Sequence, residues 1–170
     1  MSVSKAKQGS VAGVVGGYAP LDSGLHIPSS YIGHELDYVE FTSPVSITAT
    51  SEATANTIVT GSAVAYDGST VVLIEFFAPY LTVPASAVND TIFCLYDGSS
   101  SIGFMGLIST VSSATTQRLS NPRLARRLTP SNASHTYSIR AYVGSGTASV
   151  GAGSGGVANH VPGFIRITKV

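Results

Sequence analysis

Hydrophobic and polar residues alternate with a period of two along most of this chain. In HTYSIRAYV (residues 135–143), Tyr137 and every second residue after it fall on one side, whereas Ser138, Arg140 and Tyr142 fall on the other. Such alternation is typical of a β-strand that buries one face. The same pattern predicts eight further strands, at residues 37–41, 45–50, 57–66, 70–78, 91–97, 101–108, 123–128 and 163–170.

Turn residues separate these segments, and no window carries the apolar stripe of a helix. Asp67-Gly68 and Asp97-Gly98 each stand between two predicted strands. Asp-Gly readily adopts the positive φ angles of a tight hairpin. Short strands at regular spacing predict an all-β fold, an antiparallel sandwich or barrel.

The segment VVLIEFFA, residues 71–78, is apolar on both faces except at Glu75. This pattern is typical of a central strand that is covered on both sides, and a second copy of the chain is the simplest cover for the outer side. A buried carboxylate needs a cation, and Arg140 and Arg166 are the candidates. Structural pairing of Glu75 is favoured over a catalytic role. The candidates for a subunit interface or a buried ion pair are therefore Glu75, Phe77, Arg140, Tyr142 and Arg166.

Charge is scarce in this sequence. Charged residues make up 11% of the 170 residues, and the formal net charge is zero, whereas about 25% is usual. This argues against a nucleic-acid partner. It is consistent with surface buried between subunits, or alternatively with a surface rich in Ser and Thr. Arg123, Arg126 and Arg127 form the one local cluster, interpreted as a solvated strand face in preference to a site for an acidic partner or phosphate.

The single cysteine, Cys94, lies in an apolar segment, so we expect no intramolecular disulfide and an inert core thiol. No apolar run is long enough for a signal-peptide core or a membrane span, so we expect a soluble protein that is made in a cytoplasm and does not insert in membranes.

Catalytic motifs are incomplete. His34-Glu35 begins a zinc-protease motif, but Tyr38 replaces the second histidine. The glycines at 151, 153 and 156 fit a dinucleotide motif without its strand and helix, and are interpreted as a loop. No nucleophile elbow occurs, and His135 and His160 suggest no site. We therefore predict no enzyme, no catalytic residues, no metal and no cofactor.

The last third of the chain resembles a known family. Residues 128–156, LTPSNASHTYSIRAYVGSGTASVGAGSGG, and the closing VPGFIRITKV are similar to trimeric jelly-roll heads of the tumour-necrosis-factor-like type, particularly those in virion proteins of tailed bacteriophages. The resemblance covers roughly residues 38–170. It implies an antiparallel jelly-roll sandwich, a final strand in the middle of the inner sheet, and a homotrimer. On this basis the head domain is expected at residues 37–170.

The N-terminal residues 1–36 are expected to form an extended arm. GGYAPLDSGLHIP is similar to a phrase in phage fibre and minor virion proteins, although Leu25-His26 follows Gly24 where a Gly-Lys pair is usual. Prolines favour extended backbone here. The expected anchoring residues are Tyr18, Leu21, Ile27, Pro28 and Tyr31.

Together these features predict a non-enzymatic structural protein on the virion surface, made in the cytoplasm of a host bacterium. The favoured function is capsid decoration, in which a homotrimer binds the major capsid protein through its arms. The alternative is the receptor-binding tip of a tail fibre, in which the arm binds a fibre or baseplate protein and the head recognises a host surface glycan. A cellular lectin or cytokine-like ligand shares the fold but is disfavoured.

Overall fold

The computed structural model of this protein describes residues 34–83, 89–110 and 117–170. A compact unit comprises Glu35–Val170, which begins two residues before the head boundary expected from the sequence. The described residues contain strands and one short 3-10 turn, η1 (Glu52–Thr54). The strands are β1 (Glu35–Phe41), β2 (Val45–Ile47), β3 (Asn56–Thr60), β4 (Val64–Ala65), β5 (Val72–Phe77), β6 (Tyr80–Val83), β7 (Asn89–Asp97), β8 (Ser100–Thr110), β9 (Gln117–Ser120), β10 (Arg123–Leu128), β11 (Ser134–His135), β12 (Tyr137–Val143), β13 (Ala148–Gly151) and β14 (Gly163–Lys169).

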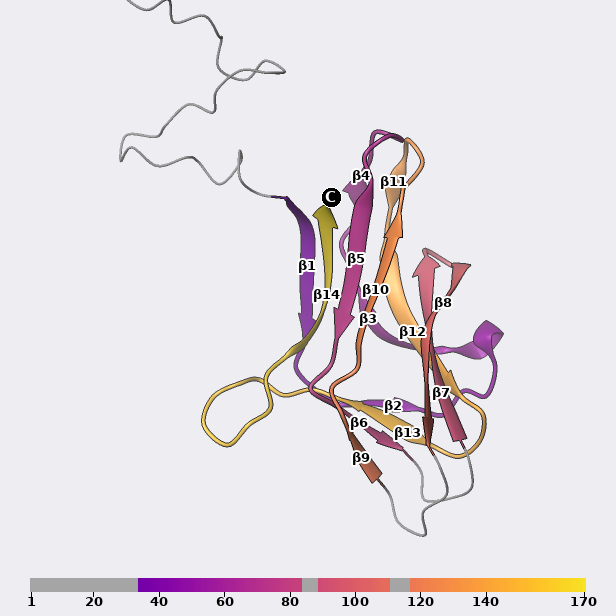
Figure 1. Cartoon of the computed structure of the whole chain (residues 1–170), viewed down its shortest axis with the longest axis vertical. Helices are drawn as coiled ribbons and strands as arrows, with labels where there is room; N and C mark the ends of the chain where they lie inside the picture. The colour runs from indigo at the N-terminus through magenta and orange to yellow at the C-terminus, as the bar shows by residue number, and fades with distance from the viewer. Residues whose placement is uncertain (1–33, 84–88, 111–116) are drawn as a thin grey trace, which may run out of the picture. The chain divides into compact units, whose positions relative to one another are not determined.

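The fold is an all-β antiparallel sandwich, as the sequence predicts (Figure 1). One sheet has the order β1-β14-β5-β10, and the other has the order β3-β12-β7-β8. When these eight strands are numbered along the chain, the orders become 1-8-3-6 and 2-7-4-5, which is the strand order of a jelly roll. A third sheet, β2-β13-β6-β9, extends the sandwich at one end, and β4 pairs with β11.

The core lies between the inner faces of the two large sheets. Val72, Ile74 and Phe76 of β5 are fully buried, and Phe76 meets Phe93 of the opposite sheet with ring centroids 5.6 Å apart. Burial of each such side chain contributes about 1.5–3 kcal/mol. The alternation predicted for β12 is confirmed, because Tyr137 and every second residue after it belong to this core.

The two Asp-Gly turns differ. Asp97 pairs with Ser100, and Gly98 has φ 56°, so the β7–β8 hairpin is confirmed as a tight turn. The hairpin predicted at Asp67-Gly68 is wrong, because β4 pairs with β11 whereas β5 pairs with β10 and β14. The Asp67 carboxylate instead accepts hydrogen bonds from the Thr70 hydroxyl and from the backbone N–H groups of Thr70 and Ser69, and these bonds lower its pKa.

Candidate functional site

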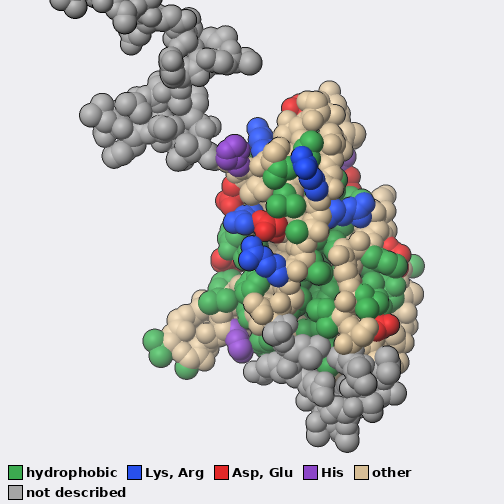
Figure 2. All heavy atoms as spheres, viewed as in Figure 1, with side chains coloured by type: hydrophobic (Ala, Val, Ile, Leu, Met, Phe, Trp, Pro, Cys, Tyr) green, Lys and Arg blue, Asp and Glu red, His purple; other side chains and the backbone are tan. Residues whose placement is uncertain are grey.

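The outer face of the β1-β14-β5-β10 sheet is the surface on which three of the five interface candidates meet, namely Glu75, Phe77 and Arg166. Along β5 the inward residues are fully buried, whereas Leu73, Glu75 and Phe77 on the outer side are only partly buried. Among the described residues, the strand is therefore fully covered on one side alone. Figure 2 shows this face, where acidic and basic side chains gather over β1, β14, β5 and β10.

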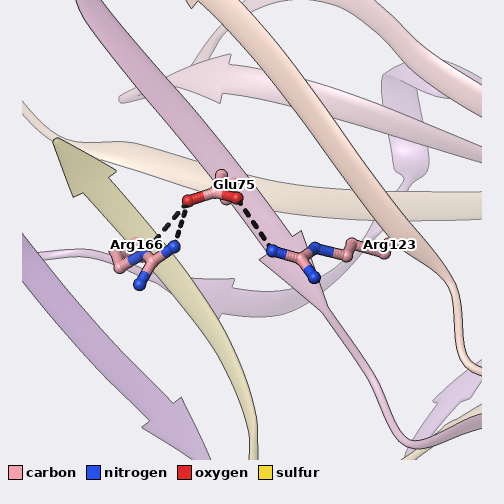
Figure 3. A network of polar contacts seen from close by, with 3 residues as sticks. All are labelled: Glu75, Arg123 and Arg166. Carbon is pink, nitrogen blue, oxygen red and sulfur yellow. Dashed lines mark hydrogen bonds and ion pairs between the residues drawn. The ribbon is translucent and has the colours of Figure 1, made fainter. Parts of the chain in front are cut away.

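Glu75 is at the centre of an ion network on this face (Figure 3). Arg166, directly opposite it on β14, donates from Nε to Oε2 over 3.0 Å, and Arg123 of β10 donates from Nη2 to Oε1 over 3.3 Å. The Glu75 side chain is only 12% exposed. The hydrogen bond from Arg166 is the main cause that lowers the pKa of Glu75, against the effect of burial, and the same bond raises the pKa of Arg166.

A row of aromatic rings lies beside this network. The Phe164 ring on β14 is 5.2 Å from the Tyr38 ring of β1 and 5.4 Å from the Phe77 ring of β5. The Arg166 guanidinium lies 5.9 Å from the Phe164 centroid. Tyr38 is 42% exposed, and its hydroxyl donates to Glu40. This surface therefore combines apolar rings with charges that already have partners, a combination suited to contact with another protein.

Arg140 does not pair with Glu75, and this part of the ion-pair hypothesis is wrong. It lies on β12 of the opposite sheet, where its guanidinium sits 4.1 Å from the Tyr96 ring centroid and Nη2 donates to the Gly98 carbonyl. Tyr142 lies on the same outer face as Arg140, against the small cluster of Ile92, Cys94 and Tyr96. Arg166 is the predicted partner that the structure brings to Glu75.

The arginine cluster divides between two environments. Arg123 and Arg127 lie on the exposed face of β10, and Arg126 lies on the other, partly buried face. Arg123 also belongs to the Glu75 network. Arg126 instead donates from Nη1 to the Ile102 carbonyl of β8, so it links the edges of the two large sheets. The expected solvated face is therefore confirmed for Arg123 and Arg127, which are exposed, and is wrong for Arg126, which is partly buried.

Cys94 is fully buried, as predicted for an inert thiol, although it belongs to the cluster outside β7 and not to the central core. Burial raises the pKa of its thiol to about 12. Two apolar residues near this cluster, Phe104 and Leu107 of β8, are 59% and 54% exposed, and no feature of the sequence pattern singles them out.

A hollow lies on the same side of the molecule, between η1 and the β7–β8 turn. It is open to solvent, and it is lined by Ser51, Glu52, Ala53, Tyr96, Ser99, Ser101 and Arg140. Tyr96 donates its hydroxyl to the Glu52 carbonyl over 2.7 Å, and Ser101 hydrogen-bonds the Glu52 carboxylate. This arrangement gives hydroxyl, carboxylate and guanidinium groups on one concave surface.

Sequence reasoning also missed a constellation at the C-terminal end of β7, where Asp97 is the last residue of the strand. His135, for which no site was predicted, lies between Ser131 and Asp97 within hydrogen-bond distance of both. Ser131 and His135 are four residues apart, but Asp97 arrives from a distant part of the chain. A sequence pattern cannot reveal such a group, because the fold alone brings the aspartate close.

The five residues proposed to anchor the arm lie outside the described residues, as does most of the arm. Among the described residues, no group of three or more His, Cys, Asp or Glu side chains could hold a metal ion. No helix in that part of the chain is long and apolar enough to cross a membrane. No known protein family and no curated protein sequence matches this chain.

Proposed function

We propose that this protein is a structural component of a tailed-bacteriophage particle, in which a homotrimer of the jelly-roll head decorates the capsid. The observation that carries self-association is the outer face of β1-β14-β5-β10. Its ring row, Tyr38, Phe164 and Phe77, is only partly covered in the single chain. The phage particle itself rests on the sequence resemblance of the head and the arm.

The ion network lowers the desolvation cost of burying this face in an interface. A lone carboxylate in an interface would be costly to desolvate, but both oxygens of Glu75 already accept hydrogen bonds from arginines of the same chain. The aromatic rings can then supply apolar contact area without leaving an unpaired charge beneath them. A trimer packed through this face would carry three N-terminal arms. Three linked arms bind the capsid lattice with avidity, because each arm that binds raises the local concentration of the others.

The proposal has two parts that are tested separately. Light scattering of the purified chain at micromolar concentration should give three times the mass of one chain, and a stable monomer would overturn the trimer. The copy number per particle, measured by quantitative mass spectrometry against the major capsid protein, should be comparable with that protein. A handful of copies would instead place the protein in the tail.

Deletion of residues 1–33 tests the arm. The compact unit begins at Glu35, so the truncated chain should keep its fold and its oligomeric state. When the truncated chain replaces the full-length protein during assembly, it should not be incorporated into the particles. Normal incorporation of the truncated chain would overturn the role of the arm while leaving the trimer untouched.

The hollow beside η1 supports the second candidate, a receptor-binding tip that recognises a bacterial surface glycan. Its serines, Glu52 and Arg140 offer donors and acceptors that suit a hydroxyl-rich ligand. Binding of the chain to host cells, lost in Arg140→Ala but kept in Arg123→Ala, would favour this function over decoration. Equal binding by both variants would count against it.

A further inference from the structure

Ser131, His135 and Asp97 form a continuous chain of hydrogen bonds at the end of the sandwich where β4 pairs with β11. Ser131 Oγ lies 2.9 Å from His135 Nε2, and His135 Nδ1 lies 2.5 Å from Asp97 Oδ2. Because Nδ1 faces a carboxylate, it carries the proton of the neutral ring, which leaves Nε2 free to accept from the Ser131 hydroxyl. Serine, histidine and aspartate therefore stand in the order and polarity of a nucleophile, its base and the group that orients the base.

The base and its orienting group are held in place. The His135 side chain is 14% exposed, and its ring stacks on Tyr137 with an interplanar angle of 7°. The second oxygen of Asp97 accepts from the Thr136 backbone N–H over 3.3 Å. Packing and hydrogen bonds thus fix the imidazole before any substrate arrives.

The loop that carries the serine is also anchored. The Ala133 carbonyl accepts from the Tyr66 N–H over 2.9 Å, and the Ala133 N–H donates to the Ser131 carbonyl over 2.8 Å. Gly68 packs against the backbone of Asn132 so closely that a Cβ at position 68 would lie 3.0 Å from the Asn132 nitrogen. Ser131 itself is exposed, so an incoming molecule can reach its hydroxyl.

The surroundings of Nε2 favour proton transfer to it. The Ser131 carbonyl oxygen lies 3.2 Å from Nε2. This oxygen cannot form a hydrogen bond with unprotonated Nε2, because both atoms are acceptors. It accepts a hydrogen bond once Nε2 is protonated. Together with the Asp97 carboxylate, this oxygen stabilises the imidazolium that forms when the serine loses its proton.

We propose that Ser131 is an activated nucleophile that hydrolyses short-chain acyl esters, an activity that stands independently of the structural role proposed above. The Ser131 oxygen attacks the ester carbonyl while its proton moves to His135 Nε2. The C–O bond to the leaving alcohol then breaks, and His135 returns the proton to that alcohol. Water hydrolyses the acyl-serine, with His135 as the base, and releases the carboxylic acid and free Ser131.

The exposure of Ser131 defines the class of substrate. The serine does not line the hollow beside η1, nor a second hollow that is lined by Leu36, Ala65, Tyr66, Asp67, Thr70 and Lys169. An exposed nucleophile suits a small acyl group carried on the outside of a larger molecule, because an exposed hydroxyl does not lie at the bottom of a deep cavity.

The test uses the full chain and two probes, a fluorophosphonate that labels activated serines and p-nitrophenyl acetate. Mass spectrometry should find the fluorophosphonate on Ser131, and no label on the exposed Ser154, which serves as an internal control. Ser131→Ala and His135→Gln should each lower kcat/KM for p-nitrophenyl acetate at least tenfold, whereas Ser154→Ala should leave it unchanged.

Circular dichroism and melting temperatures of the variants separate loss of activity from loss of fold. If Ser131 takes up no more label than Ser154 in the wild-type chain, the proposal is overturned, whatever the variants do. It is also overturned if folded Ser131→Ala hydrolyses the ester at the wild-type rate. Neither result would bear on the trimer or on its attachment to a particle.

Discussion

Arg166 places two of its nitrogens, Nε and Nη2, on the same carboxylate oxygen of Glu75, directly across from it on the neighbouring central strand. The other oxygen of Glu75 is left to Arg123. The carboxylate is thus shared between two strands that flank β5, and it joins three strands of one sheet through side chains as well as through the backbone.

Replacement of this carboxylate should destabilise the head. In Glu75→Gln the amide keeps the shape but loses the charge that both arginines contact, so we expect a loss of about 1–2 kcal/mol. Urea unfolding followed by circular dichroism measures it. Glu40→Gln is the matched control, since Glu40 lies on the same sheet and accepts a hydrogen bond from Tyr38 alone among the described residues. An equal effect of both substitutions would count against the network.

The same network predicts a dependence on pH. Hydrogen bonding to Arg166 lowers the pKa of Glu75 in the folded protein. Its stabilisation is therefore fully present above the unfolded value of about 4.3 and is lost as the pH falls through the lower folded value. The difference in unfolding free energy between wild type and Glu75→Gln should shrink between about pH 5 and pH 3. A difference that stays constant over this range would contradict the assignment.

A charge in the ring row should dissolve the proposed trimer. Phe164→Glu places an acid between Tyr38 and Phe77, where an interface would have to desolvate it, so we expect the mass in light scattering to fall to that of one chain. Phe104→Glu is the matched control, because Phe104 is an exposed phenylalanine on the opposite sheet. If Phe104→Glu abolishes association and Phe164→Glu does not, the interface lies on the β3-β12-β7-β8 sheet and our proposal is wrong.

The thiol of Cys94 should be unreactive in the folded protein. It is fully buried, and burial raises its pKa to about 12, so almost no thiolate exists at pH 8. A colorimetric disulfide reagent should therefore give one equivalent of reaction in 6 M guanidinium chloride and almost none in native buffer. Rapid native reaction would show that the β7 side of the sandwich opens easily.

Strand positions followed from the two-residue period, because inward and outward residues have different burial along β5 and β12. The short strands β6, β9 and β13 were missed. Strands of this length show too few alternations to reveal a period, and Gly151, interpreted as part of a loop, ends β13. The period also cannot tell which strands are neighbours, so the Asp67-Gly68 hairpin was predicted where the chain crosses between sheets.

The candidate site was only partly predictable for the same reason. Glu75 was singled out because a lone acid in an apolar strand needs a cation, and that argument holds for any fold. Which arginine pairs with Glu75 depends on the order of the strands in the sheet. The alternation in the sequence does not distinguish Arg140 from Arg166, because both lie in strands with the same pattern. The contact between Asp97 and His135 depends on the pairing of β7 with β12, which no local pattern contains.

The place of β14 between β1 and β5 has a consequence for biosynthesis. Among the described strands, the one made first in the head, β1, pairs only with β14, residues 163–169, so this pairing cannot form until those residues have left the ribosome. Contacts this distant in sequence are slow to form. The exposed edges of β1 and β5 would meanwhile be open to other nascent chains. Correct assembly of this protein therefore depends on how quickly its closing strand arrives.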